Sequence, residues 1–262
     1  MHPPAQAPAG LSGPASLRAR GGGGPLTRLK RFAHRGASAL APENTLAAFD
    51  LAIRLGCDWI ETDLRLTADH VPILIHDTHV ERTTDGKGRV DSFSLPQLRR
   101  LEAGTWGKWS LRGERIPTLD ELLEWGRGVR CGMNLEIKED FHVDELVRQL
   151  AARFTGSRSL DRVLFSSFRA DDLLRLRAAF PQARLAWLAS RQSRGLTPLD
   201  RRVRLAAMHP KDRLINPRLV KRCHRLGLAV HVWVVNQPRR LAELETLPVD
   251  GVMTDDPRLF TM

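Results

Sequence analysis

Strand-like and helix-like segments alternate along this chain from Leu29 to its C-terminal end. Such alternation is typical of a parallel α/β architecture, because a helix must carry the chain back before the next parallel strand begins. Eight strand positions begin near residues 31, 58, 133, 163, 184, 205, 228 and 251. Eight β/α units favour a closed (β/α)8 TIM barrel over an open doubly wound sheet.

One extended run, Val71–Ile75, does not fit the simple alternation. Only Thr67–His70 separates it from the preceding strand, and four residues cannot hold a crossover helix. We therefore expect an antiparallel pair followed by a short inserted loop segment, Asp77–Pro117. Within that loop, Trp106 and Trp109 would form either a lid over the leaving-group pocket or the core of the loop itself.

Helix-capping residues mark several of the expected helices. Thr118 with Glu121 forms a capping box, and Asn216 stands before Pro217 as at a helix start. For Asn44 we favour the same kind of role, as a cap on the helix that follows it.

The first 28 residues differ in composition from the rest of the chain. They are rich in Pro, Ala, Gly and Arg, include Gly21–Gly24, and lack the apolar stretch of a secretory signal. We expect residues 1–28 to form a disordered tail and residues 29–262 to form one barrel domain. No apolar run approaches the roughly 20 residues that span a bilayer, so stable membrane insertion is not expected.

The net charge is +11, and the chain has three cysteines. A positive excess attracts anions such as phosphate esters, lipid head groups or nucleic acid, but we favour the alternative interpretation, an Arg-rich composition with solvated helix faces. No zinc-finger spacing or RNA-binding signature accompanies the charge, so no nucleic-acid partner is expected. Cys57, Cys131 and Cys223 lie far apart without a CxxC pattern, which argues against a disulfide framework or a zinc site. We expect reduced, buried cysteines in a cytoplasmic protein.

Five short polar blocks stand at or near the ends of strand-like runs. They are His34-Arg35-Gly36, Glu61-Thr62-Asp63, His76-Asp77, Glu136-Ile137-Lys138 and Trp233-Val234-Val235-Asn236. Alternate side chains of a strand share a face, so Glu61 points with Asp63 and Glu136 points with Lys138. Active sites of TIM barrels lie at the C-terminal ends of the strands, where all five blocks would meet.

These residue types suit a metal-assisted reaction at phosphorus. Glu61, Asp63 and Glu136 offer the oxygen ligands that Ca2+ and Mg2+ prefer, and three adjacent carboxylates would repel one another without a cation. Structural ion pairs with Arg or Lys are the alternative for each carboxylate. His34 and His76 beside such a cluster would take a proton from the nucleophile and return one to the leaving group.

Other polar residues have two interpretations each. Arg35 offers a bidentate fork for phosphate or a clamp for Glu61, and Lys138 supplies a point charge. Trp233 faces inward by strand alternation, either at the site or as plain barrel core. Surface or packing roles are expected for three further histidines, His79, His209 and His231.

The chain resembles the glycerophosphodiester phosphodiesterase family over essentially residues 31–260. The resemblance rests on the number and order of its motifs, and one departure is mild, since the family often has Thr where Val234 stands. The motifs are His34-Arg35-Gly36-Ala37, Pro42-Glu43-Asn44-Thr45, Glu61-Thr62-Asp63, Thr67, Pro72 through His76-Asp77, Arg82-Thr83-Thr84-Asp85-Gly86, Arg115-Ile116-Pro117-Thr118-Leu119, Glu136-Ile137-Lys138, Ser166-Ser167-Phe168, Trp233-Val234-Val235-Asn236, Asp250-Gly251-Val252 and Thr254-Asp255.

The resemblance implies a barrel hydrolase that cuts small-molecule glycerophosphodiesters into glycerol 3-phosphate and an alcohol, with Ca2+ or Mg2+ as cofactor. The roles that it implies are metal binding by Glu61, Asp63 and Glu136, catalysis by His34 and His76, phosphate contact by Arg35 and Lys138, and a pocket wall at Trp233.

Two alternative functions remain open at this point. A lysophospholipase D-like enzyme would keep the site but act on lysophospholipids, and it would need an apolar groove beside Trp106 and Trp109. A non-catalytic barrel that binds phosphate or nucleic acid would be favoured by the loss of a site residue, and none is missing. The nucleophile is either the substrate's own glycerol hydroxyl, which gives a cyclic phosphate, or water.

Overall fold

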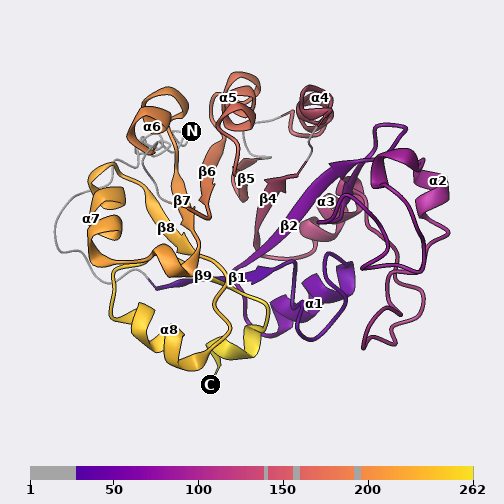
Figure 1. The fold of residues 1–262 in the computed structure, drawn as a ribbon, viewed down its shortest axis with the longest axis horizontal. Coiled ribbons are helices and arrows are strands. Elements are labelled where there is room, and N and C mark those ends of the chain that lie inside the picture. The colour runs from indigo at the N-terminus through magenta and orange to yellow at the C-terminus, as the bar shows by residue number, and fades with distance from the viewer. Residues whose placement is uncertain (1–27, 139–140, 156–159, 192–195, 262) are drawn as a thin grey trace, which may run out of the picture.

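The computed structural model describes residues 28–138, 141–155, 160–191 and 196–261, and within them eight parallel strands close into a barrel (Figure 1). Strand β1 pairs with both β2 and β9, which closes the ring. The barrel strands are β1 (Lys30–His34), β2 (Trp59–Leu66), β4 (Gly132–Ile137), β5 (Val163–Ser167), β6 (Arg184–Ala189), β7 (Ala207–Pro210), β8 (Ala229–Val232) and β9 (Gly251–Thr254). The predicted TIM barrel is confirmed, whereas the predicted tail, apart from Arg28, lies outside the described residues.

Helices surround the barrel and bury one apolar face each against the outer side of the strands (Figure 1). They are α1 (Leu46–Arg54), α3 (Leu119–Arg127), α4 (Val143–Arg153), α5 (Ala170–Ala179), α6 (Leu196–Val203), α7 (Pro217–Arg225) and α8 (Pro238–Glu245). Phe49, Leu146 and Leu176, from α1, α4 and α5, are fully buried in this layer. Burial of such side chains contributes about 1.5–3 kcal/mol each, which makes this layer the main stabilising core.

The expected hairpin is present. Strand β3 (Pro72–Leu74) runs antiparallel to the end of β2, with Leu64 opposite Leu74. It opens a segment, residues 67–117, that we call the insert and that lies beside the barrel with α2 (Leu95–Leu98) at its outer edge (Figure 1). The insert has a small core of its own, formed by Ile73, Ile75, Val80, Val90, Leu98, Ala103 and Ile116.

Apolar side chains and aromatic rings fill the barrel near the N-terminal ends of the strands. Leu164, Ala186 and Ala207 pack together near the N-terminal ends of their strands. The ring of Phe32 contacts the rings of both Trp59 and His231, and the centroids of the Phe32 and His231 rings lie 4.8 Å apart. This packing fills the N-terminal end of the barrel, so a ligand cavity can open only at the C-terminal mouth.

The capping predictions have mixed outcomes. Thr118 and Glu121 form the expected capping box, and Asn216 accepts from the backbone of α7 as a cap. The prediction for Asn44 was wrong, because the side chain of Thr45 caps α1 and receives the Ala48 N–H. Sequence alone could not separate two adjacent residues that both suit a cap.

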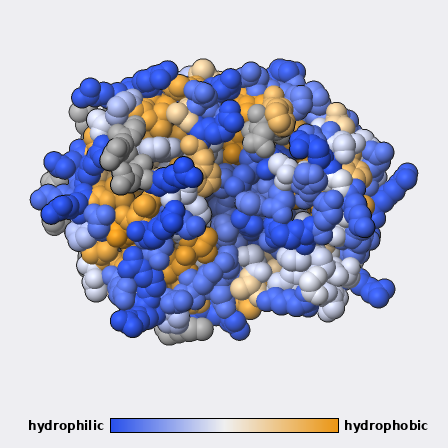
Figure 2. Space-filling model, viewed as in Figure 1, coloured by the Kyte–Doolittle hydropathy of each residue, from blue (hydrophilic) through white to orange (hydrophobic). Residues whose placement is uncertain are grey.

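The surface is mainly hydrophilic in the view of Figure 2, with hydrophobic patches on its left side. Among the described residues, no helix has the length and apolar character needed to cross a membrane. Cys57, Cys131 and Cys223 are free and buried, as expected. A cytoplasmic location stays a prediction.

Candidate active site

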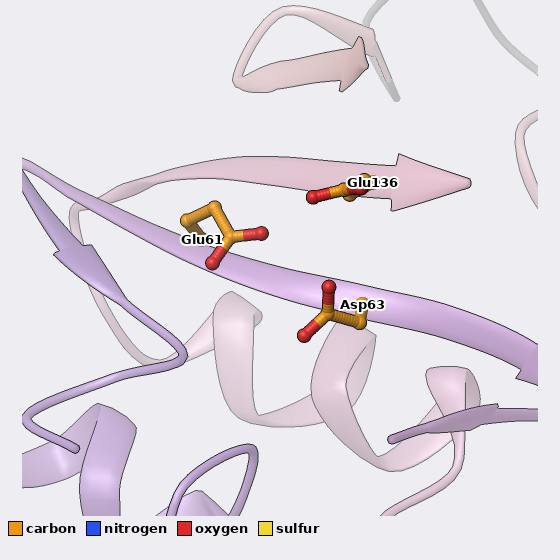
Figure 3. Close-up of side chains that lie close together, drawn as sticks. All are labelled: Glu61, Asp63 and Glu136. Carbon is orange, nitrogen blue, oxygen red and sulfur yellow. The ribbon is translucent and has the colours of Figure 1, made fainter. Parts of the chain in front are cut away.

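Three carboxylates from two neighbouring strands meet at the barrel mouth (Figure 3). Glu61 and Asp63 lie on one face of β2, and Glu136 of β4 stands in register with Asp63. One carboxylate oxygen from each lies within 4.8 Å of the others, and all three side chains are buried. Strand alternation therefore brings together the predicted set.

Burial and mutual repulsion shift these carboxylates in different directions. Desolvation, with repulsion from Asp63, raises the pKa of Glu61 well above its usual range and that of Glu136 to about 7. Burial also acts to raise the pKa of Asp63, but Arg35, His76 and Lys138 outweigh it, and the pKa is lowered. Without a cation, the site favours the ionised form of Asp63 and the protonated forms of Glu61 and Glu136.

The carboxylate cluster fits a hard divalent cation. Oε1 of Glu61 is buried and has no hydrogen-bond partner among the described residues. An unpaired buried acceptor is costly, whereas a cation bound by three carboxylate oxygens would satisfy it and remove the repulsion. Ca2+ and Mg2+ both take such ligands, and the three carboxylates do not distinguish them.

Two cations flank the carboxylates. The guanidinium of Arg35 lies 3.4 Å from Asp63 and donates to Glu43 at 3.0 Å, while its backbone N–H donates to Glu61 at 3.0 Å. The ammonium of Lys138 lies 2.8 Å from Glu136 and 3.8 Å from Asp63. The guanidinium of Arg35 thus clamps Asp63 and Glu43, whereas the expected partner, Glu61, binds the backbone N–H of Arg35.

The backbone at Arg35 adopts a conformation that side chains rarely take. Its φ is +56°, in the left-handed region, and Gly36 follows with φ +79°. A Cβ at Gly36 would lie 2.7 Å from Cβ of Ala48, so only glycine lets the turn approach α1 so closely. The strained turn aims the Arg35 N–H at Glu61.

His34 is held by a residue from the far end of the chain. Its Nδ1 lies 2.6 Å from Asp255, and its Nε2 lies 3.9 Å from Glu61. Asp255 also accepts from Asn236 at 2.6 Å and from Ser38 at 3.2 Å. The carboxylate therefore fixes the ring and leaves Nε2 toward the cluster.

His76 has an equivalent support. Its Nδ1 lies 2.6 Å from Asp77, which accepts from Arg82, and Arg82 binds Glu43 through both terminal nitrogens at 2.7 and 2.8 Å. Burial, aided by Arg35 and Lys138, lowers the pKa of His76. A ring held this way is neutral near pH 7 and can accept a proton.

Arg65 of β2 ties the insert to the barrel. Its guanidinium donates to the carbonyl of His76 at 2.9 Å and to that of Lys138 at 2.6 Å. The buried side chain of Arg65 thus fixes the distance between His76, a candidate proton carrier, and Lys138, a candidate phosphate contact.

A cavity of about 170 Å³ opens over these residues. Its lining combines polar residues, among them His34, His76, Arg35 and Lys138, with the apolar side chains of Phe168, Leu188, Trp233 and Met253. The indole N–H of Trp233 donates to the carbonyl of His209 at 2.7 Å, which fixes the ring in the wall. All eight predicted site residues are therefore brought to one mouth.

Several supporting residues escaped sequence reasoning. Asn44 donates to Asp63 at 3.0 Å and accepts from Thr62 at 2.7 Å, so it orients a carboxylate instead of capping a helix. Asp255, Asn236, Glu43 and Arg82 lie in quoted motifs but had no assigned role. The expected packing roles of His209 and His231 are confirmed, since both are buried and lie 3.0 Å apart between ring nitrogens, while His79 is exposed.

Trp106 and Trp109 do not line the cavity. Their rings lie 6.5 Å apart, edge to face, and Lys108 lies 4.6 Å from the ring centroid of Trp109. The two indoles contact each other within the insert, but both are half-buried and neither belongs to its apolar core, so a lid and a loop core both stay predictions.

Comparison with known proteins gives consistent matches. The model of the Glycerophosphoryl diester phosphodiesterase family matches residues 34–259. A glycerophosphodiester phosphodiesterase of Caldanaerobacter subterraneus is 35% identical over 229 residues, which cover 86% of this chain and 93% of that protein.

Solved structures agree. An Oleispira antarctica phosphodiesterase in complex with the product sn-glycerol-3-phosphate has a TM-score of 0.83 and 30% identity, over 88% of this chain and 95% of that one. A glycerophosphodiester phosphodiesterase from Agrobacterium tumefaciens has a TM-score of 0.76 and 28% identity, over 88% and 98% of the respective chains.

Proposed function

This chain belongs to the glycerophosphoryl diester phosphodiesterase family, and we propose that its barrel mouth uses a divalent cation and two histidines to hydrolyse glycerophosphodiesters. The enzyme is a phosphoric diester hydrolase, and its products are glycerol 3-phosphate and an alcohol. The observation that carries the proposal is the cluster of Glu61, Asp63 and Glu136 in a cavity lined by His34 and His76.

In this proposal, Glu61, Asp63 and Glu136 hold Ca2+ or Mg2+. When bound, the cation polarises a phosphoryl oxygen and balances the negative charge of the site. The raised pKa values of Glu61 and Glu136 support this role, because a cation is what lets both carboxylates ionise together.

Arg35 and Lys138 contact the phosphate from the two sides of the carboxylate cluster. Arg35 presents a planar fork and Lys138 a point charge, and both stay protonated because neighbouring carboxylates raise their pKa values against the effect of burial. Trp233 forms the apolar wall against which the carbon chain of the glycerol moiety packs.

His34 and His76 move the protons. Each has its Nδ1 bound to a carboxylate, so each presents Nε2 to the substrate. One ring takes a proton from the nucleophile, which is either water or the substrate's own glycerol hydroxyl, and the other protonates the departing alkoxide; such transfers typically contribute 10²–10⁴-fold in rate. Attack by the glycerol hydroxyl would give a cyclic phosphate, which water must then open to release glycerol 3-phosphate. The lowered pKa of His76 suits it to begin the reaction as the neutral base.

Release of glycerol 3-phosphate from glycerophosphocholine tests the proposal. We expect release with Ca2+ or Mg2+, none with EDTA, and losses of at least about 100-fold in His34→Ala, His76→Ala and Glu61→Ala. His79→Ala is the matched control, because this exposed histidine also lies in the insert but does not line the cavity. Wild-type protein that is folded yet releases nothing from glycerophosphodiesters or lysophosphatidylcholine under any metal would refute the catalytic proposal.

A further inference from the structure

Asn134 of β4 has a buried carboxamide whose oxygen lacks a partner. Its side chain is only 1% exposed, and Oδ1 makes no hydrogen bond with the described residues. Buried acceptors are almost always satisfied, because leaving one unpaired costs about as much as a lost hydrogen bond. An unpaired acceptor that borders a binding cavity therefore points to a hydrogen bond completed by the ligand.

The position of Asn134 is deep in the cavity. It lies two residues before Glu136 on the same face of β4, and it stands in register with Glu61 of β2. Because the strands run toward the mouth, Asn134 lies below the level of Asp63 and Glu136. It lines the same cavity as His34 and Trp233.

A second unpaired group, which does not border the cavity, provides a comparison for Asn134. The hydroxyl of Ser166 on the neighbouring β5 is also buried without a hydrogen-bond partner among the described residues. Ser166 stands in register with Glu136, but it is not among the residues that line the cavity. Ser166 therefore serves as a comparison, because it lies in the barrel interior like Asn134 but would not contact a ligand in the cavity.

The chemistry of the cavity indicates which part of the substrate reaches Asn134. Arg35 and Lys138 are the cationic side chains of the cavity and meet the phosphate in the proposed function, so the remaining, apolar part of the lining is left for the carbon chain esterified to it. Leu188, Trp233 and Met253 present an apolar wall to that chain. The volume of about 170 Å³ is large enough for a phosphate with a three-carbon chain.

We propose that Asn134 is a specificity-determining residue whose carboxamide oxygen accepts a hydrogen bond from a free hydroxyl of the glycerol moiety. This inference rests on the proposed function and names the group that selects its substrate class. Diesters whose chain lacks those hydroxyls leave Asn134 unpaired on binding and are rejected for that reason.

The test combines substitutions at Asn134 with the removal of the free hydroxyls from the ligand. Affinities of glycerol 3-phosphate and n-propyl phosphate, which has the same chain without the free hydroxyls, are measured calorimetrically at a fixed Ca2+ concentration. The proteins are wild type, Asn134→Leu, Asn134→Ala and Ser166→Ala. The two Asn134 variants differ in volume, so a packing effect of one of them cannot imitate the loss of a hydrogen bond.

Wild type and Ser166→Ala should prefer glycerol 3-phosphate by at least about tenfold. Both Asn134 variants should bind glycerol 3-phosphate about tenfold more weakly while their affinity for n-propyl phosphate changes by less than about twofold. Titration of Ca2+ alone should give the same affinity in all four proteins.

Equal weakening of both ligands in the Asn134 variants, or a loss of Ca2+ affinity, would assign Asn134 to the metal site and overturn the inference. Unchanged discrimination would overturn it as well. Failure of the proposed function is distinguishable, because wild type would then release no glycerol 3-phosphate from its diesters, whatever Asn134 does.

Discussion

Asn44 has a larger effect on the site than its position before a helix suggests. It is buried, has φ +56°, and joins Thr62 to Asp63 through its carboxamide. Residues that orient a metal ligand typically change affinity or activity 10–100-fold when they are removed. The residue therefore combines a backbone role with a side-chain role, and the two can be separated.

We expect Asn44→Gly and Asn44→Ala both to lose about 10–100-fold in kcat/KM, because both lose the hydrogen bond to Asp63. Asn44→Ala should in addition be less stable than Asn44→Gly by about 1 kcal/mol, since alanine is strained at positive φ. Steady-state kinetics and urea unfolding measure the two effects. Full activity of Asn44→Gly would leave Asn44 with a backbone role only.

The buried pair His209 and His231 makes stability depend on pH. Burial lowers the pKa of His209 to about 3 and that of His231 well below its usual value. Both rings are therefore neutral when folded but take up protons in the unfolded chain near pH 6.5, so stability is complete above that pH and is lost as pH falls through it. The loss is up to about 1.4 kcal/mol per pH unit for each ring, down toward the folded pKa.

His209→Gln should reduce this dependence, because an uncharged amide can bind His231 without titrating. Denaturant unfolding of wild type and variant between pH 5 and 8 measures it. Parallel stability curves for the two proteins over that range would show that His209 does not contribute.

Among the elements, closure of the barrel decides where His34 points. Strand β1 pairs with β9, and this pairing sets Asp255, just after β9, against the ring of His34 at the end of β1. The carboxylate determines which ring nitrogen carries the proton and which faces the site.

Asp255→Asn should lower kcat by about 100-fold or more with little change in KM, because the amide permits the wrong tautomer and no longer stabilises the protonated ring. Asp256→Asn is the matched control, since Asp256 binds Arg258 instead. An equal kcat for Asp255→Asn and Asp256→Asn would show that Asp255 does not set the orientation of the His34 ring.

The sequence predicted those elements whose signals are local. Strand starts and the short connection before β3 depend on nearby residues, and the carboxylate cluster follows from alternation along two strands. Helix α6 was missed, since Leu196-Thr197-Pro198 resembles a loop although proline suits a first helical turn. The bond between His34 and Asp255 spans 221 residues, and no local pattern encodes it.

For the whole molecule, cation binding and stability are linked. The carboxylates of Glu61, Asp63 and Glu136 repel one another, and a bound cation would remove this repulsion. A ligand that binds only the folded state stabilises that state. Ca2+ at about 100 times its Kd should add about 2.7 kcal/mol, which corresponds to a rise in Tm of about 5–10 °C.

Glu61→Gln should remove this rise, because it deletes a ligand without changing side-chain volume greatly. Thermal unfolding with Ca2+ and with EDTA measures this rise in Tm, and circular dichroism checks that the variant keeps its secondary structure. An unchanged Ca2+ effect in Glu61→Gln would place the responsible ion elsewhere on the protein.

The separate core of the insert divides the two candidate proton carriers between two packing units. The three carboxylates and His34 belong to the barrel, whereas His76 follows β3 and the small apolar core that contains Ile73 and Ile75. Arg65 joins the two units through its bonds to the carbonyls of His76 and Lys138. A change in the packing of the insert would therefore displace His76 and leave the carboxylate cluster in place.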